Sequence, residues 1–173
     1  YRKPIMALLI SPLIVPIIII AAGMFFFYSH IGLAYTHLGV ILAHAVMGTP
    51  YVVITVTATL IGFDETLIRA SGSLGAKPLR TFFRVIMPLI TPGVISGALF
   101  AFITSFDEVV LIYFLADAEQ KTIPIQMWSG LRQQISPSIL AVATMLVTFS
   151  VILLVAVELL RRRSERLRTQ VIS

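Results

Sequence analysis

The feature that most constrains this chain is the length of its uncharged stretches. Asp, Glu, Lys and Arg are absent from three long runs, at residues 4–63, 85–106 and 133–157. A helix needs about 20 apolar residues to cross the hydrocarbon core of a bilayer, so the first run is long enough for two such helices. The runs are continuous rather than alternating, which favours helices over the strands of a membrane barrel. The sequence therefore predicts an all-α membrane protein.

A polar dip at residues 28–37 divides the first run and supplies a turn. Spans are then expected at residues 5–27, 38–61, 89–106 and 138–160. Only 12% of the residues are charged, against roughly 25% in soluble domains. The first span is too long for a signal peptide, and no soluble domain follows it. We therefore expect one transmembrane domain over residues 1–173, a bundle of about four helices with a loop at residues 62–88.

The positive charges are distributed unequally between the two sides that four spans define. One side holds both chain ends and the 62–88 loop, with eleven of the thirteen Lys and Arg residues, and the other holds only Lys121 and Arg132. Loops on the cytoplasmic side of a membrane carry an excess of Lys and Arg. Both ends and the loop are therefore expected to be cytoplasmic. Because the cations flank apolar spans rather than cover a soluble face, no nucleic-acid partner is expected.

The loop at residues 62–88 has the pattern of two short amphipathic helices that meet at a glycine. Asp64 is suited to cap the first helix and Gly75 to end it. A proline at its first position suits the second helix, expected at residues 78–87. Such a hairpin either lies on the lipid surface or presents the small residues 70–73 to a cytoplasmic partner. Lipid binding would explain the cations and aromatic residues of the hairpin but not its small residues.

Small residues recur at every fourth position of the third expected span, at Gly93, Gly97, Ala101 and Ser105. Such a face lets two helix backbones approach closely in lipid, so we expect a tight helix contact within this subunit. His44 lies inside the second expected span and is expected to hydrogen-bond to a neighbouring helix.

Enzymatic and metal-binding signatures are absent from the sequence. There is no Cys, which excludes disulfides and thiolate metal sites. His37 and His44 lie two helical turns apart, about 10 Å, which is too far for both to bind one metal ion. The sequence has neither a phosphate-binding glycine loop nor a Ser/His/Asp set, so we expect no catalytic role.

The stretch RASGSLGAKPLRTFFRVIMP, residues 69–88, resembles the cytoplasmic loop of permease subunits of bacterial ABC importers. The pattern of that loop is Glu-Ala-Ala, three residues, Gly, nine residues, Ile, one residue, Leu-Pro. The matching residues here are Arg69, Ala70, Ser71, Gly75, Val85, Met87 and Pro88. Two further stretches, PLITPGVISGALFAFITSFDEVVL and TIPIQMWSGLRQQISPSILAVATML, resemble the spermidine and putrescine branch of that family.

The resemblance implies part of a six-helix type I permease fold in a bacterial inner membrane, with two further spans upstream. It also implies that the 62–88 loop forms a coupling helix that docks into a cleft of a separate ATPase subunit. The residues implied at this contact are Glu65, Arg69, Ala70, Ser71, Gly75, Ala76 and Pro88. ATP and Mg²⁺ would bind that partner. A sister or identical permease and an external substrate-binding protein would complete the importer.

Arg69 stands where the family pattern has glutamate. Three explanations remain open: the partner subunit carries a compensating change, Glu65 one turn earlier supplies the carboxylate, or the coupling is weaker.

The same resemblance implies a substrate path for polyamines or a related small cationic solute, lined by Asp107, Glu108, Ser105 and Gly97. A structural reading competes with it, because Ser105 and Glu108 have the spacing of a capping box that would start another helix. Alternative functions are an importer for another small solute, a transporter driven by an ion gradient, or a membrane scaffold that transports nothing. A gradient-driven transporter should carry carboxylates within its spans, and no Asp or Glu lies deep in any expected span.

Overall fold

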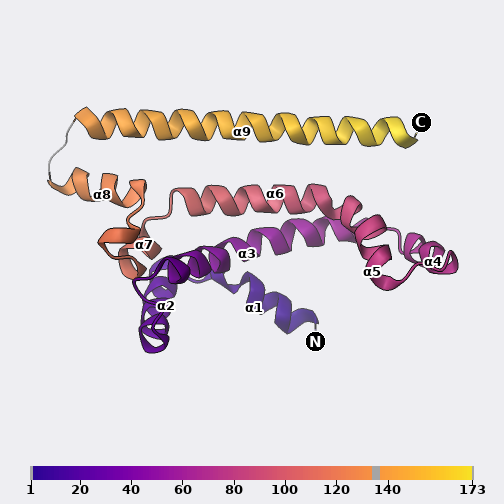
Figure 1. Cartoon of the computed structure of the whole chain (residues 1–173), viewed down its shortest axis with the longest axis horizontal. Helices are drawn as coiled ribbons and strands as arrows, with labels where there is room; N and C mark the ends of the chain where they lie inside the picture. The colour runs from indigo at the N-terminus through magenta and orange to yellow at the C-terminus, as the bar shows by residue number, and fades with distance from the viewer. Residues whose placement is uncertain (1, 134–136, 173) are drawn as a thin grey trace. The chain divides into compact units, whose positions relative to one another are not determined.

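The structure is a computed structural model that describes residues 2–133 and 137–172, and every regular element in these ranges is helical. The chain divides into two compact units, and the boundary along the sequence lies between Lys121 and Thr122. The first unit contains α1 (Arg2–Ile14), α2 (Ile17–Ile31), α3 (His37–Ile61), α4 (Thr66–Ser73), α5 (Pro78–Thr81), the π-helical η1 (Phe82–Ile86), α6 (Met87–Phe106), α7 (Val110–Leu115) and the 3-10 helix η2 (Ala118–Gln120). The second contains α8 (Ile123–Gln133) and α9 (Pro137–Ile172) (Figure 1).

Three helices in the described part of the chain are long and apolar enough to cross a membrane, at His37–Ile61, Pro78–Phe106 and Pro137–Val155. α1 and α2 make a fourth crossing if together they form one broken span. The two helices are bent by 109° relative to each other at the break between them. The span expected at residues 5–27 thus corresponds to two helices with a break at residues 15–16, and not to one straight helix. Pro16 causes the break, because its ring disfavours helical backbone at Val15 and it has no N–H to donate.

The second helix of the loop does not end before the third span. α5, η1 and α6 follow one another without an intervening turn, so the expected boundary between a helix at residues 78–87 and a span at 89–106 is absent. In the π-helical segment the backbone N–H of Met87 donates to the carbonyl of Phe82. Pro88 has no N–H to continue the α-helical pattern, and the wider turn accommodates it.

The last helix extends beyond the expected span at residues 138–160. α9 contains 36 residues and is therefore about 54 Å long, whereas a hydrocarbon core is about 30 Å thick. If α9 crosses a membrane, part of the helix must extend beyond the bilayer.

A small core joins α2, α3 and α7 in the first unit. Its buried side chains are Ala21, Tyr28, Ala43, Leu111 and Leu115. The expected turn at residues 28–37 is present, because α2 ends at Gly32 with a φ of 72° and Thr36 caps α3 by accepting a hydrogen bond from the Gly39 N–H at 3.0 Å. This core holds α7 against the beginning of α3. The α4–α5 hairpin follows the opposite end of α3 (Figure 1).

Candidate functional site

The expected small-residue face of α6 packs against α3. A Cβ atom on Gly93 would lie 2.9 Å from the carbonyl oxygen of Thr55, and one on Gly97 would lie 2.6 Å from the Cα of Val52. Both distances are shorter than a carbon contact allows, so only glycine fits at these two positions. The tight helix contact predicted from the sequence is confirmed. We call this contact between α3 and α6 the seam.

The seam continues toward the end of α3 that lies away from the hairpin. A Cβ on Gly48 would lie 2.9 Å from the Cβ of Ala101. At the next position, Ser105 Oγ and His44 Nδ1 share a hydrogen bond of 2.8 Å. The expectation that His44 bonds to a neighbouring helix is thus confirmed, and the partner is the fourth residue of the small-residue face.

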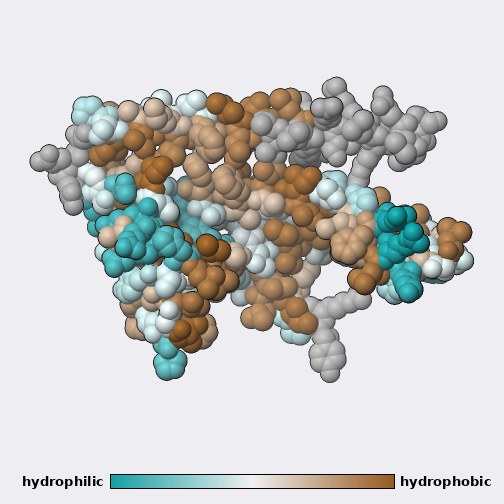
Figure 2. Space-filling model, viewed as in Figure 1, coloured by the Kyte–Doolittle hydropathy of each residue, from teal (hydrophilic) through white to brown (hydrophobic). Residues whose placement is uncertain are grey.

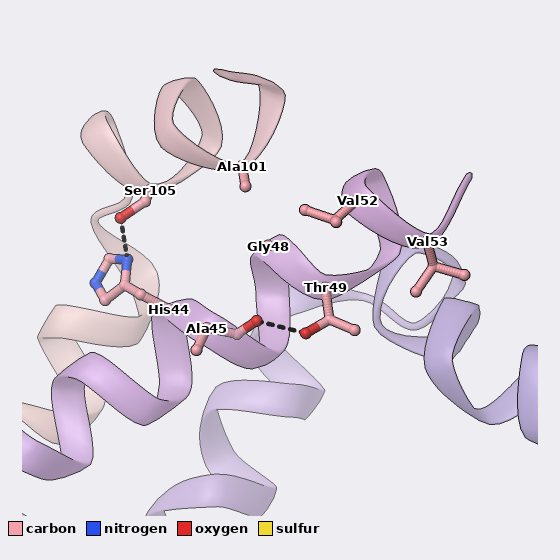
Figure 3. Close-up of a pocket in the computed structure, with 8 residues that line it drawn as sticks. All are labelled: His44, Ala45, Gly48, Thr49, Val52, Val53, Ala101 and Ser105. Atoms are coloured by element: carbon pink, nitrogen blue, oxygen red, sulfur yellow. Dashed lines mark hydrogen bonds between the residues drawn. The ribbon is translucent and has the colours of Figure 1, made fainter. Parts of the chain in front are cut away.

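An open hollow of about 440 Å³ lies beside this part of the seam. It is lined by six residues of α3 between His44 and Val53 and by Ala101 and Ser105 of α6 (Figure 3). The hydroxyl of Thr49 donates to the Ala45 carbonyl at 2.7 Å, so its proton is not available to a ligand. The hollow is therefore mostly apolar, with His44 as its ionisable group.

The four residues expected to line a substrate path are placed differently. Gly97 is buried in the seam and faces α3, so its role in the structure is packing. Ser105 lines the hollow. Asp107 is exposed at the end of α6, and Glu108 is half-buried beside it.

The capping box expected from Ser105 and Glu108 is absent. Ser105 is bonded to His44, and Glu108 acts alone: its Oε1 accepts from the backbone N–H of Val110 at 2.6 Å and of Leu111 at 3.0 Å. The carboxylate of Glu108 therefore stabilises the first turn of α7. Two N–H groups that have no partner within a helix are satisfied in this way.

At the opposite end of the seam, the hairpin turns where the sequence predicts. Gly75 has a φ of +78°, a left-handed conformation that glycine adopts without strain. The N–H of Gly75 donates to Gly72 at 2.9 Å and the N–H of Ala76 donates to Ser71 at 3.1 Å, which is the Schellman arrangement. Asp64 is exposed at the start of the hairpin, and the hydrogen bond from the Thr66 N–H lowers the pKa of its carboxyl group.

One side-chain hydrogen bond joins the two arms of the hairpin. The hydroxyls of Ser71 on α4 and Thr81 on α5 lie 2.8 Å apart, and Thr81 is buried. No sequence pattern indicated Thr81, because its partner lies ten residues away and neither a helical nor a strand period relates the two positions.

The other residues expected at an ATPase contact are mostly accessible. Glu65, Arg69 and Ala70 are exposed on one arm, Ala76 is half-buried after the turn, and Pro88 is exposed near the start of α6. The hairpin also exposes large apolar side chains beside its cations (Figure 2). Among the residues that the structure describes, no three His, Asp or Glu side chains gather closely enough to hold a metal ion.

Similarity to proteins of known class shows what kind of membrane protein this is. The family model of the binding-protein-dependent transport system inner membrane component matches residues 1–166. The chain belongs to that family.

Individual relatives show which transport systems have permeases similar to this chain. The chain is 28% identical over 163 residues to the spermidine/putrescine transport system permease protein PotC of Haemophilus influenzae. That alignment covers 94% of this chain and 63% of the relative. It is 36% identical over 105 residues to the putrescine transport system permease protein PotI of Escherichia coli, covering 61% of this chain and 37% of that protein. The chain thus spans less than two thirds of the length of either relative.

A solved structure of the MetNI methionine ABC transporter in an inward-facing conformation has a similar fold. The TM-score is 0.73 at 20% identity, and the match covers 94% of this chain and 73% of that chain. The described helices therefore have the fold of an ABC transporter permease.

Proposed function

We propose that this chain is a permease subunit of an ATP-driven importer and that its α4–α5 hairpin is the contact through which an ATPase subunit drives it. One observation carries the proposal: α4 has no buried residue, while the second arm of the hairpin continues through η1 into α6. An accessible element that is continuous with a membrane helix can transmit movement to it.

The exposed surface of the hairpin suits a protein cleft. Leu74 is 88% exposed, Leu79 74% and Phe83 62%. Exposed apolar groups rimmed by polar residues are typical of interaction sites. The Schellman turn and the Ser71–Thr81 hydrogen bond fix one arm on the other. A displacement of α4 would therefore also move α6.

The remaining parts of the importer belong to the same proposal. ATP and Mg²⁺ would bind the ATPase partner, so this chain would have no catalytic role. A sister or identical permease would complete the path, and a substrate-binding protein would deliver the solute. The hairpin and both chain ends would be cytoplasmic, with Lys77, Arg80 and Arg84 at the anionic inner leaflet.

The proposed substrate is a polyamine such as spermidine or putrescine. Two relatives are named for these solutes. The end of the seam away from the hairpin carries Asp107 and Glu108, and carboxylates at an entrance favour cations. Uptake of labelled putrescine and spermidine by the assembled transporter, compared with an amino acid, distinguishes this substrate from another small solute. Stronger uptake of the amino acid would contradict it.

The contact with the ATPase is tested by co-purification from membranes. Leu74→Gln removes an apolar side chain that is 88% exposed, so the chain itself should fold normally. If Leu74 is central to the interface, its loss should weaken ATPase binding by about tenfold or more. Tyr113→Gln is the matched control, because Tyr113 on α7 is 69% exposed at the end of the unit away from the hairpin. Equal ATPase binding by both variants, or crosslinks from the hairpin to phospholipid alone, would refute the contact.

A further inference from the structure

We propose that α8 lies along the surface of the bilayer and that its exposed apolar side is a binding surface for phospholipid. This side, which we call the α8 face, consists of Ile123, Met127, Trp128 and Leu131. The inference does not depend on the transported solute. It rests on the proposed function in one respect only, because the proposed orientation makes this membrane surface the outer one.

The α8 face is apolar and largely open to its surroundings. Ile123, Met127 and Leu131 follow one another at intervals of four residues, so they lie on one side of the helix, and Trp128 lies beside Leu131. Ile123 is 52% exposed, Trp128 49% and Leu131 50%. The opposite side carries Ser129, which is also exposed. A helix with one apolar and one polar side is suited to the boundary between lipid and water.

The contact between α8 and α9 places α8 at the edge of the hydrocarbon core. A Cβ on Gly130 would lie 2.8 Å from the Cδ1 of Ile139, so α8 packs beside the first turn of α9 (Figure 1). The part of α9 that can cross a membrane is Pro137–Val155. Its 19 residues extend over about 28 Å, close to the thickness of a hydrocarbon core, about 30 Å. Ile139 thus lies near one boundary of the core, and α8 lies at the level of the lipid headgroups.

Trp128 and Arg132 together have the chemistry of a headgroup contact. The Cζ of Arg132 lies 5.4 Å from the centre of the Trp128 ring, so the ring holds the guanidinium group at the edge of the α8 face. Tryptophan is enriched at the boundary between lipid and water. A guanidinium group donates two parallel hydrogen bonds to a phosphate. A phospholipid whose acyl chains contact the α8 face would therefore bring its phosphate close to Arg132.

Phospholipid suits the α8 face better than another protein does. The neighbouring helix enters lipid at the same level, so the headgroups and upper acyl chains meet the apolar side of α8 without any rearrangement. A soluble substrate-binding protein approaches from the water and would meet the polar side, with Ser129, first.

The test identifies the neighbours of α8 with a photoreactive amino acid in the complete transporter. Leu131→benzoylphenylalanine places the reactive group on the α8 face. The transporter is reconstituted in vesicles of equal parts phosphatidylethanolamine and phosphatidylglycerol, with or without saturating substrate-binding protein. After irradiation, the crosslinked products are identified by mass spectrometry. Position 131 should capture phospholipid under both conditions.

Ser129→benzoylphenylalanine is the matched control. Ser129 is exposed on the same helix but on its opposite side. Position 129 should capture at least about tenfold less lipid than position 131, the factor expected when an apolar group of this size is in water rather than in lipid. Equal capture of lipid at both positions would overturn the inference, because neither side of α8 would then be preferred by the bilayer.

Arg132→Gln, combined with the reactive group at position 131, tests the headgroup contact. It should lower the ratio of phosphatidylglycerol to phosphatidylethanolamine among the captured lipids by about fivefold, the effect of one cation near an anionic surface. Arg132→Lys keeps the charge and should retain the ratio. An unchanged ratio in Arg132→Gln would overturn the role of Arg132.

Capture of a protein decides against the inference. If position 131 is crosslinked to the substrate-binding protein or to another transporter subunit, or yields no lipid product, the α8 face is not a phospholipid surface. If the variant at position 131 does not assemble with the ATPase, Ile123→benzoylphenylalanine decides the question in the same way, because Ile123 belongs to the same face and is 52% exposed.

These readouts are separate from those that test the proposed function. Vesicles that transport no polyamine would refute the proposed substrate, while the lipid crosslinks would still decide the role of α8. The leaflet is identified by labelling the lipid amines of right-side-out vesicles with an impermeant biotin reagent before irradiation. The captured phosphatidylethanolamine should carry biotin. Captured lipid without biotin would refute the proposed orientation and would support the contact between α8 and lipid.

Discussion

At the scale of single residues, the seam depends on glycines, which have no side chain to hold the two helices apart. Gly93 and Gly97 on α6 let the backbone of α3 approach so closely that no Cβ fits between them. Lipid provides no hydrophobic force to bring helices together, so close packing must supply the attraction. The hydroxyl of Thr55 is bonded within its own helix, to the Tyr51 carbonyl at 2.9 Å, and leaves no unsatisfied donor at the contact.

Gly97→Ala should therefore destabilise the subunit. The new Cβ would meet the Cα of Val52 at 2.6 Å, and a backbone atom cannot move aside as a flexible side chain can. We expect a loss of about 1–3 kcal/mol, the usual cost of overpacking a well-packed contact. The measurement is thermal unfolding of the purified transporter in detergent.

Gly23→Ala is the control for this prediction. Gly23 lies inside α2, and a Cβ there would meet nothing within 4 Å. Because alanine favours helix over glycine by up to about 1 kcal/mol, this variant should be as stable as wild type or slightly more so. Equal unfolding temperatures for Gly97→Ala and Gly23→Ala would show that the two helices separate easily and that the seam is not tightly packed.

The sequence predicted one side of each contact better than the contact itself. The repeat of small residues on α6 was visible in the sequence. Its partners on α3 share no residue type that would mark them: Thr55, Val52, Gly48 and His44. The capping box that local spacing offered for Ser105 and Glu108 is absent, because Ser105 makes a tertiary bond to His44 instead. Local patterns cannot reveal a partner 61 positions away.

At the scale of elements, the hairpin and α6 form one continuous path along the backbone. The boundary expected near residue 88 came from counting apolar residues, which marks where a helix enters lipid and not where it begins. The position of the bend between α1 and α2 was also not readable from the count of apolar residues. Pro12 and Pro16 both lie in one apolar run, but α1 contains Pro12 and only Pro16 interrupts the helix. The order of helices was predictable, whereas the response of each helix to its prolines was not.

Gly75→Ala should loosen the hairpin without changing its surface. Gly75 has a φ of +78°, and the added methyl group would meet nothing within 4 Å, so backbone strain is the only cost. That cost is about 1–2 kcal/mol for an alanine in the left-handed region. Amide hydrogen exchange across residues 66–81 of the purified transporter should accelerate at least about fivefold, since about 1 kcal/mol corresponds to that factor.

Gly72→Ala tests whether the conformation of Gly75 is the cause. Gly72 belongs to α4, where a Cβ would also meet nothing within 4 Å and where helical backbone suits alanine. Exchange in this variant should stay equal to wild type or slow down. The explanation fails if both substitutions accelerate exchange to the same extent.

At the scale of the whole molecule, the two ends of the first unit have different chemistry. The hairpin end exposes Lys77, Arg80 and Arg84, whereas the α7 end carries the acidic residues Asp107, Asp117 and Glu119. This asymmetry was readable from the sequence, because it needs only the positions of charges relative to apolar runs. Opposite charge at the two ends agrees with the proposed function, in which cations enter on one face of a membrane and an ATPase acts from the other.

The absence of cysteine makes this orientation directly testable. Ser73→Cys places one thiol on the exposed hairpin, and Glu119→Cys places one at the exposed opposite end. A membrane-impermeant maleimide added outside cells with a permeabilised outer membrane should label the thiol at position 119 and not that at 73. Inverted membrane vesicles should give the reverse. The unsubstituted chain, which has no thiol, controls for background, and full labelling after detergent shows that both thiols are reactive. Labelling of both positions from one side would contradict the proposed orientation, because the hairpin and the acidic end could not then be separated by the bilayer.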